Sequence, residues 1–406
     1  MRIIVIGCGI GGACLSLALD GLGLDHVVLE QAPELTEVGA GLQLSPNAVR
    51  VLERLGLEED LRRFGVPPQA HVFRDGLNGE LLLETPLMPL VEETFGAPYF
   101  HAHRADLLAA LTVRLGTGRV RLGATVAAVH QDESGVRAEL ADGSVERGDV
   151  LIGADGIHSL VRAHLFPDEA PRQSGCVAWR GLVPVETARD LGLEQNSMVW
   201  MGPERSVVMY YVAGGTRFNW VGIGPFNANA RESWSARGSN KAALEEYAGW
   251  QPVLRELIAA TDSLFMTSLF DRDPLEHWVA GRMALMGDAA HAMMPFHAQG
   301  AGQSIEDAWV LARCLAEAGG PAAASTALHR YQDLRLERAN RVQAQSRSAE
   351  HLFHMSDPDD IARRNARFAR HRNRGGFPQQ QRWLFSYDAE RAVTGEDADW
   401  RAMAWS

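Results

Sequence analysis

The chain has 406 residues, of which 46% are hydrophobic and 22% charged, so it is an ordinary folded protein long enough for two or more subdomains. Its net charge of −12 argues against a nucleic-acid partner, and no apolar run is long enough to cross a bilayer, so we expect no membrane contact. Met1 leads directly into a predicted core strand without room for a signal peptide, which favours a cytoplasmic location.

The first thirty residues predict a strand, a glycine turn, a helix and a second strand. Arg2 to Ile6 is a short β-branched run, and the sequence G-C-G-I-G-G at Gly7 to Gly12 follows it directly. A helix rich in small residues comes next, and the second strand, His26 to Leu29, ends at Glu30. This is the full context of a dinucleotide-binding fingerprint.

Each glycine of this turn has a predicted task. Gly7 permits the tight turn, Gly9 lets the backbone approach a pyrophosphate, and Gly12 lets the helix pack on the strand. The helix N-terminus then presents free N–H groups to the pyrophosphate, and Glu30 accepts hydrogen bonds from an adenosine ribose. The predicted cofactor-binding residues here are Gly7, Gly9, Ile10, Gly11, Gly12 and Glu30.

Residues 37–47 form a predicted glycine-rich loop that contains Gly41 and Gln43 and leads into an amphipathic helix over residues 48–55. The loop is either backbone packed against a flat, bulky group or an ordinary connection.

A later helix starts near His101 with Arg104 in its first turn, which is an unfavourable place for a cation on dipole grounds. Arg104 is therefore either a surface arginine or one directed at an anionic ligand.

Residues 120–145 predict a strand hairpin with an Asp142-Gly143 turn, and residues 149–162 predict a buried strand that ends in Gly-Ala-Asp-Gly before a helix starts near Ser159. Residues 175–270 then contain strands between Gly, Pro and Asn turns, which indicates an antiparallel sheet inserted in an α/β chain. In the strand over residues 206–212 the odd-numbered and even-numbered side chains occupy opposite faces, so one face packs on a helix and the other lines a cavity.

Residues 282–287 predict another buried strand that ends at Gly287-Asp288. A glycine-rich segment follows, and a helix is predicted over residues 305–315 with Glu306 and Asp307 in its first turn, where acids suit the helix dipole. A long charged helix then runs to about His354. The Arg-rich run over residues 363–374 is interpreted as a solvated helix face. The four cysteines, which lack any paired ligand spacing, predict reduced buried thiols and no metal site; they are Cys8, Cys14, Cys176 and Cys314.

The order and context of three glycine-containing elements resemble the group A flavoprotein aromatic hydroxylases, the single-component FAD-dependent monooxygenases. Gly7 to Gly12 is similar to their FAD fingerprint, Asp155-Gly156 to their Asp-Gly motif, and Gly287-Asp288 with Pro295 to their second FAD motif. Arg104 is similar to the family's flavin-phosphate arginine. Other segments look closest to the salicylate hydroxylase, 3-hydroxybenzoate 6-hydroxylase and 6-hydroxynicotinate 3-monooxygenase branch; they are residues 39–47, 178–181 and 297–302.

The resemblance implies that FAD is bound tightly but not covalently. Its further implied contacts are Gly41, Arg104, Val126, Asp155, Gly156, Gly287, Asp288, Pro295, Gly300, Ala301 and Gly302. Gly300 to Gly302 precede the predicted helix, so their N–H groups are placed to stabilise negative charge on the N1–C2 side of reduced flavin. Implied substrate contacts are Gln43, Arg180, Met209, Tyr211, Phe296 and His297.

The implied chemistry is reduction of the flavin by NADH or NADPH, capture of O2 as a flavin C4a-hydroperoxide, and oxygen transfer to an electron-rich ring. The protein must position and ionise a phenol, and His297 and Tyr211 are the candidates for that proton contact, with Pro295 beside them. Each residue also has a purely structural alternative. His297 would be a loop residue that caps backbone groups, and Tyr211 would be a residue of the hydrophobic core. Arg180 faces a substrate carboxylate, the nicotinamide phosphate or only a structural ion pair.

The predicted fold is therefore a Rossmann-like FAD-binding domain of the glutathione-reductase type, with an inserted antiparallel-sheet substrate domain and a C-terminal helical region. The FAD-binding parts are residues 1–70, 101–170 and 276–350, the last with the long helix. The substrate domain takes residues 171–275 with an excursion over 71–100, and a helical segment takes 351–406.

The predicted function is hydroxylation of a small phenolic acid of the hydroxybenzoate or aminohydroxybenzoate class, with decarboxylation if the attacked carbon bears the carboxylate. A hydroxypyridine carboxylate is the alternative, although Phe296 stands where the hydroxynicotinate enzyme has a histidine and Val207 where it has another. A flavin-dependent halogenase, whose Trp-x-Trp-x-Ile-Pro signature is absent, and a non-catalytic FAD-binding module are remote alternatives. The choice of nucleotide, and of monomer or homodimer, stays open.

Overall fold

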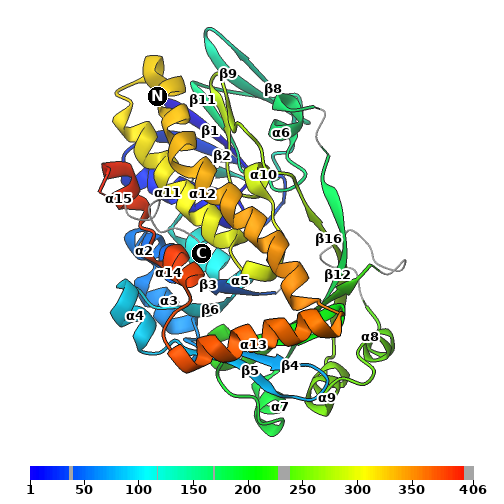
Figure 1. The fold of residues 1–406 in the computed structure, drawn as a ribbon. Helices are drawn as coiled ribbons and strands as arrows, with labels where there is room; N and C mark the ends of the chain where they lie inside the picture. The colour runs from blue at the N-terminus through cyan, green and yellow to red at the C-terminus, as the bar shows by residue number, and fades with distance from the viewer. Residues whose placement is uncertain (36–39, 117, 168–169, 227–237, 397–406) are drawn as a thin grey trace.

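The computed structural model describes residues 1–35, 40–116, 118–167, 170–226 and 238–396. It is a mixed α/β structure in which a mostly parallel sheet and a larger, mostly antiparallel sheet lie at opposite ends, with two long helices running between them (Figure 1). The fold class predicted from the sequence is confirmed. No helix in the described ranges is both long and apolar enough to span a membrane.

The first sheet has the strand order β17-β18-β11-β1-β2-β7. Strand β1 (Arg2–Ile6) lies in its centre because its β-branched side chains are buried on both faces, and it pairs in parallel with its two neighbours. The other strands are β2 (Asp25–Leu29), β7 (Val120–Arg121), β11 (Val150–Gly153), β18 (Met283–Leu285) and β17 (Val279–Ala280), which alone is antiparallel. Helix α1 (Ile10–Gly21) packs between β1 and the helices α5 (Arg104–Arg114) and α11 (Gly300–Glu317).

A small antiparallel sheet follows the predicted hairpin, and its strands are β8 (Val126–Asp132), β9 (Gly135–Leu140) and β10 (Val145–Gly148). Helix α6 (Leu160–Leu165) starts where it was predicted, because the Ser159 hydroxyl accepts a hydrogen bond from the Arg162 N–H at 2.8 Å and caps the helix.

The seven-stranded sheet has the order β16-β12-β15-β14-β13-β4-β5, and only the pair β13 and β4 is parallel. Its strands are β4 (Ala70–Asp75), β5 (Leu81–Pro86), β12 (Arg172–Pro184), β13 (Ser197–Gly202), β14 (Arg205–Val212), β15 (Arg217–Pro225) and β16 (Leu264–Asp271). One face packs on short helices, which are α7 (Val185–Asp190), α8 (Asn240–Glu246) and α9 (Pro252–Ala259). The predicted single helix over residues 241–257 is thus two helices, because Gly249 adopts φ +83° and Pro252 starts α9.

The glycine-rich segment predicted as a loop contains a strand. Residues 40–47 include β3 (Gly41–Leu44), which pairs antiparallel with β6 (Phe100–His103), whereas residues 37–39 lie outside the described residues. Gly41 also lets the seven-stranded sheet approach β3 closely, because a Cβ there would lie 2.6 Å from the Tyr210 ring. The neighbouring helices are α2 (Pro46–Arg54), α3 (Glu58–Phe64) and α4 (Leu90–Phe95).

The C-terminal half is helical. Helix α11 starts at Gly300, five residues before the predicted start, because a glycine-rich first turn has low helix propensity and hides the boundary in the sequence. The remaining helices are α10 (Asp288–His291), α12 (Ala324–Phe353), α13 (Pro358–Arg374), α14 (Gln379–Ser386) and α15 (Ala389–Thr394), with short 3₁₀ turns at Ala213–Gly215, Pro295–His297 and Pro321–Ala323. Helix α13 crosses the seven-stranded sheet and ends beside α14 (Figure 1).

Candidate active site

The glycine turn after β1 has the geometry that a bound dinucleotide needs. Gly7 adopts φ +97°, and a Cβ on Gly12 would lie 2.0 Å from the Gly7 carbonyl oxygen, so the helix packs on the turn only without side chains there. A Cβ on Gly9 would meet nothing within 4 Å, which leaves its backbone open to a ligand. The Glu30 carboxylate accepts hydrogen bonds from the N–H groups of Cys8 at 2.7 Å and Ala32 at 2.8 Å, so it is fixed over the turn.

The other two acidic motifs follow neighbouring strands of the same sheet, β11 and β18, at the edge where β1 also ends. Asp155 Oδ2 accepts from the Leu160 N–H at 2.8 Å, while its buried Oδ1 has no partner among the described residues. Burial raises the pKa of the Asp155 carboxyl group. Asp288 is exposed after Gly287, which adopts φ +57°, and a Cβ on Gly300 would lie 3.8 Å from Asp288 Oδ1.

An open glycine backbone, a fixed carboxylate at the end of β2 and a buried carboxylate oxygen without a partner together fit an adenine dinucleotide such as FAD. The backbone N–H of Arg104 donates to the Ala40 carbonyl at 3.0 Å, so the first turn of α5 adjoins β3. Val126 starts β8 two residues after Ala124, whose N–H donates to the Glu30 carbonyl at 2.8 Å, which places Val126 near the predicted adenosine end. Their contacts with the cofactor stay predictions.

The first turn of α11 contains Gly300, Ala301 and Gly302, whose N–H groups are the ones a helix leaves without intrahelical partners. Pro295 is exposed in the 3₁₀ turn that precedes it, and Gly156 follows Asp155 at φ +76°. The helix terminus therefore offers donors and partial positive charge to a ligand on this side. The predicted role at the flavin N1–C2 edge stays a prediction.

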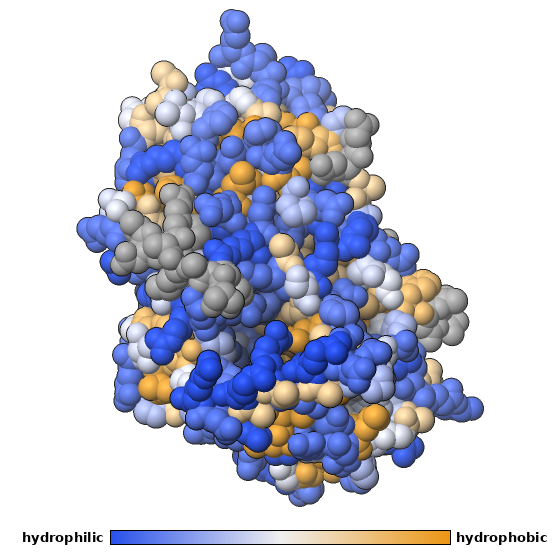
Figure 2. Space-filling view, viewed as in Figure 1, coloured by the Kyte–Doolittle hydropathy of each residue, from blue (hydrophilic) through white to orange (hydrophobic). Residues whose placement is uncertain are grey.

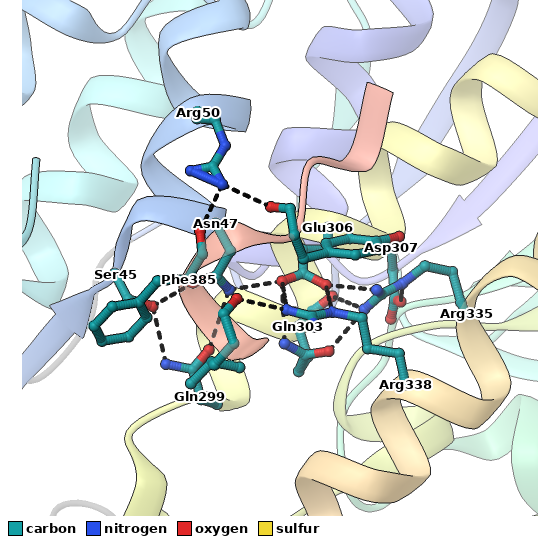
Figure 3. Close-up of polar contacts among 12 residues, drawn as sticks. Ser45, Asn47, Arg50, Gln299, Gln303, Glu306, Asp307, Arg335, Arg338 and Phe385 are labelled. Atoms are coloured by element: carbon teal, nitrogen blue, oxygen red, sulfur yellow. Dashed lines mark hydrogen bonds and ion pairs between the residues drawn. The ribbon is translucent and has the colours of Figure 1, made fainter. Parts of the chain in front are cut away.

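Four charged side chains form a buried ion cluster behind this turn (Figure 3). Arg338 Nε lies 2.8 Å from Glu306 Oε2, Arg335 Nε lies 2.8 Å from Asp307 Oδ1, and Arg335 Nη1 bridges to Glu306 at 2.5 Å. Burial alone would raise the pKa values of both carboxyl groups. The arginine charges nevertheless hold the pKa of Glu306 below its usual value, and His291 and Arg335 lower the pKa of Asp307 to about 2. Both acids lie beyond the first turn, so their predicted dipole role is wrong and buried ion pairs replace it.

Amide side chains connect the ion cluster to the segments on either side of the predicted flavin site. Asn47 Nδ2 donates to Glu306 Oε1 at 2.6 Å and to Gln299 Oε1 at 3.2 Å, and Gln299 Nε2 donates to the Ser45 hydroxyl at 3.0 Å (Figure 3). The segment after β3 and the residue before α11 are thereby fixed to each other. Sequence reasoning missed these residues, because Arg335 and Arg338 lie in a stretch of mixed charge in which nothing marks them as buried.

The prediction for β14 has the wrong face. Tyr211 Oη donates to the Leu193 carbonyl at 2.6 Å, and Tyr211 is buried with Met209 against the outer helices, away from β3 and β6. Tyr210 instead faces β6, where its ring stacks on His101 at a centroid distance of 4.3 Å. Alternate residues of a strand face opposite ways, so a shift of one residue exchanges the two sets. Tyr211 and Met209 are therefore core residues, and Tyr210 is the tyrosine of β14 on the face toward β6.

Tyr210 belongs to a buried group of aromatic and polar side chains beside β3. Tyr99 Oη donates to Gln43 Oε1 at 2.5 Å, and the Tyr99 ring meets His101 edge-on at 5.9 Å. Arg180 is half-buried nearby, and desolvation, partly offset by Tyr210, lowers its pKa to about 10. Gln43 and Arg180 are thus linked through Tyr99, His101 and Tyr210, which no local motif marks, and their contacts with a substrate stay predictions.

His297 and Phe296 are more constrained than predicted. His297 Nε2 lies 2.9 Å from Gln380 Nε2 of α14, and burial lowers the pKa of His297 to about 4. A proton-transfer role through Nε2 therefore requires this hydrogen bond to open. Phe296 packs edge-on against Phe353 at 5.8 Å in the core beneath the sheet, which favours a supporting role over substrate contact.

The chain matches known proteins along nearly its whole length. Residues 1–346 match the family model described as an FAD binding domain. The 3-amino-4-hydroxybenzoate 2-monooxygenase of Streptomyces cremeus is 37% identical over 391 residues, 96% of each chain, and the 6-hydroxynicotinate 3-monooxygenase of Bordetella bronchiseptica is 36% identical over 98% of each. The structure of Klebsiella pneumoniae HpxO complexed with FAD and uric acid is similar with a TM-score of 0.82 at 28% identity, covering 100% of this chain and 97% of that one.

Proposed function

The chain belongs to the FAD-binding family of aromatic monooxygenases, and on this premise we propose that it hydroxylates a small phenolic acid with O2 and a reduced nicotinamide nucleotide. The substrate class that we propose is an aminohydroxybenzoate or hydroxybenzoate. The observation that supports it most is the 37% identity, over 96% of the chain, to a monooxygenase whose name specifies 3-amino-4-hydroxybenzoate. Decarboxylation would accompany the reaction only if the attacked carbon carries the carboxylate.

The proposed roles follow from the surroundings of each residue. Arg180, a half-buried cation beside Tyr210, suits a substrate carboxylate, because a charge-assisted hydrogen-bonded pair is strong and directional. Tyr210 and His101, whose rings stack on each other at 4.3 Å, offer polar atoms that suit the hydroxyl group of a phenol bound beside them. The N–H groups of Gly300 to Gly302 hold negative charge on the flavin, and the flavin, when bound, supplies the oxygen chemistry.

A hydroxypyridine carboxylate is the second candidate, favoured by the 36% identity to a 6-hydroxynicotinate 3-monooxygenase. Arg180 suits its carboxylate equally well. The two candidates differ at the ring, since a pyridine nitrogen requires a polar partner. Val207 packs in the outer core with Tyr211, and Phe296 packs on Phe353, so the choice between the two rings rests on the assay.

A panel assay tests the proposal. Purified protein is mixed with FAD, then with NADH or NADPH and one of 3-amino-4-hydroxybenzoate, 3-hydroxybenzoate or 6-hydroxynicotinate, under 18O2. We expect one aromatic to stimulate nucleotide oxidation and to gain one labelled oxygen. Protein without bound FAD, or nucleotide oxidation that no aromatic stimulates, would overturn the proposal. Stimulated oxidation without a labelled product would show that the aromatic is an effector.

A further inference from the structure

One face of helix α13 carries a row of arginines. Arg363, Arg367, Arg370 and Arg374 follow one another at spacings of four, three and four residues, so they share one face along about 16 Å of helix. All four are exposed, and a strongly hydrophilic band crosses the surface where Figure 1 draws α13 (Figure 2). The opposite face is buried at Arg364 and Phe368, so this orientation of the helix is fixed.

Most of this arginine row has no acidic partner. Arg363 pairs with Asp360, whereas Arg367, Arg370 and Arg374 have no ion pair or hydrogen-bond partner among the side chains that the structure describes. Like charges three and four residues apart destabilise a helix, so the row costs stability in isolation. It does so in a protein whose net charge is −12, where carboxylates are plentiful. An anionic ligand would remove this repulsion.

A pocket of about 480 Å³ lies just beyond the C-terminal end of the row. It is lined by Thr94 and Phe95 from the end of α4 and by Phe377, Gln379, Arg382 and Ser386. Arg382 Nε donates to the Phe377 carbonyl at 3.2 Å. Its Nη2 lies beside Gly376, 3.8 Å from where a Cβ would be, and Gly376 comes two residues after the end of α13. This cation therefore lies next to the C-terminal end of the arginine row. The rings of Phe95 and Phe377 meet edge-on at 5.0 Å.

Helix α14 separates the pocket from the predicted flavin site. Its residues Gln379 and Arg382 line the pocket, whereas Gln380 reaches the other way to His297, three residues before α11. One helix diameter, about 10 Å, therefore lies between the pocket and the flavin side. A ligand bound at the pocket would be close enough for an extended molecule to reach over α14.

We propose that the arginine row and this pocket are the docking site of the nicotinamide nucleotide, binding its adenosine and diphosphate half. The inference rests on the proposed function, which needs such a nucleotide. The chain's glycine fingerprint after β1 is assigned to FAD, so the second dinucleotide binds elsewhere. Arg370, Arg374 and Arg382 supply charge to the diphosphate, and Phe95, which is partly exposed at the pocket wall, supplies aromatic surface to the adenine.

Anaerobic stopped-flow reduction of the holoenzyme by NADH and by NADPH tests the site. In the R370Q/R374Q variant we expect the apparent Kd of the nucleotide to rise about tenfold, while the limiting rate of flavin reduction stays unchanged, because charge on the diphosphate contributes to binding alone. R382Q is expected to act in the same direction. ADP-ribose, which keeps the diphosphate and lacks nicotinamide, should compete with the nucleotide in the wild type and less well in the variants.

The matched control is R147Q/R255Q, which removes two exposed arginines elsewhere. It should leave the Kd unchanged, and raised salt should weaken nucleotide binding in the wild type and control more than in R370Q/R374Q. Equal Kd values and equal salt dependence in the variant and the control would overturn the docking site while the proposed function stands. Failure of both nucleotides to reduce the wild-type flavin would overturn the two together.

Discussion

Two sets of arginines on consecutive helices have opposite surroundings. Arg335 and Arg338 of α12 are fully buried, and each is bonded to carboxylates of α11. Arg367, Arg370 and Arg374 of α13 are exposed and have no acidic partner within the described ranges. The first set connects parts of the protein to one another, whereas the second set is available to something outside it. Burial and pairing, and not residue type, separate a structural cation from a ligand-binding one.

The buried arginines also contact the C-terminal helices. Arg338 donates to the Leu384 carbonyl at 3.0 Å, and its guanidinium lies 3.9 Å from the Tyr387 ring centroid. The same side chain thus joins the C-terminal helices to the acids of α11. Removing one partner of such a cluster leaves an uncompensated charge in an interior that cannot solvate it.

The largest expected effect therefore comes from Arg338→Met. We expect the free energy of unfolding to fall by about 3–5 kcal/mol, because the Glu306 carboxylate loses its principal cation. Urea unfolding followed by intrinsic fluorescence measures it. The double variant E306Q/R338M should recover part of the loss. The control is R330Q, because Arg330 lies on α12 like Arg338 but forms an exposed pair with Glu317 of α11; it should cost about 1 kcal/mol or less. A loss of similar size for R338M and R330Q would contradict the distinction.

Three half-buried histidines extend the comparison to pH. Burial lowers the pKa of His71, His297 and His354 from 6.5 to about 4, so each stays neutral in the folded protein while the unfolded chain protonates. Their contribution to stability is complete above pH 6.5 and is lost as the pH falls from 6.5 toward 4. Each makes the free energy of unfolding fall by up to about 1.4 kcal/mol per pH unit in that window.

His71→Gln checks this dependence. We expect the variant to lose stability less steeply than the wild type between pH 6.5 and 4 in urea titrations, because one buried proton acceptor is gone. H329Q, which replaces an exposed histidine of α12, should leave the slope unchanged. An unchanged slope in H71Q would show that His71 is solvated in the folded protein.

Local patterns predicted the nucleotide-binding end of the molecule, where each signal lies within a few residues of the atoms it positions. The strand, glycine turn and helix at residues 2–21 are an example, since the turn geometry follows from the glycines themselves. The ion cluster was not predictable in this way. Asn47 and Glu306 are 259 positions apart, and nothing in either neighbourhood specifies the other.

The strand β14 shows a second limit of the sequence. Its alternation correctly separated two faces, but both carry aromatic or thioether groups, so the pattern could not say which one packs on helices. The outcome depends on how β14 sits against β6 on one face and the outer helices on the other, which is set by the whole sheet. The consequence is testable, because Tyr210 and Tyr211 are chemically identical neighbours.

Replacing each tyrosine by phenylalanine should separate the faces. We expect Y210F to raise the KM for the aromatic substrate about tenfold, because the hydroxyl on the β6 side is lost from the proposed site. Y211F should leave that KM unchanged and lower the free energy of unfolding by about 1–2 kcal/mol, since the buried Leu193 carbonyl loses its donor. Steady-state kinetics and urea unfolding measure the two effects. A raised KM in Y211F alone would restore the original assignment.

The smallest expected effect, and the sharpest contrast with Arg338, is the stability of Arg370→Gln. Arg370 lies three residues after Arg367 and four before Arg374, so removing its charge relieves repulsion on both sides of the helix. We expect the free energy of unfolding to rise by about 0.2–0.5 kcal/mol at low ionic strength, and the gain to shrink as salt screens the row. Urea unfolding at two salt concentrations measures it. A loss above about 1 kcal/mol would mean that Arg370, like Arg338, stabilises the folded chain, and the row would then be part of the structure rather than a surface that receives a ligand.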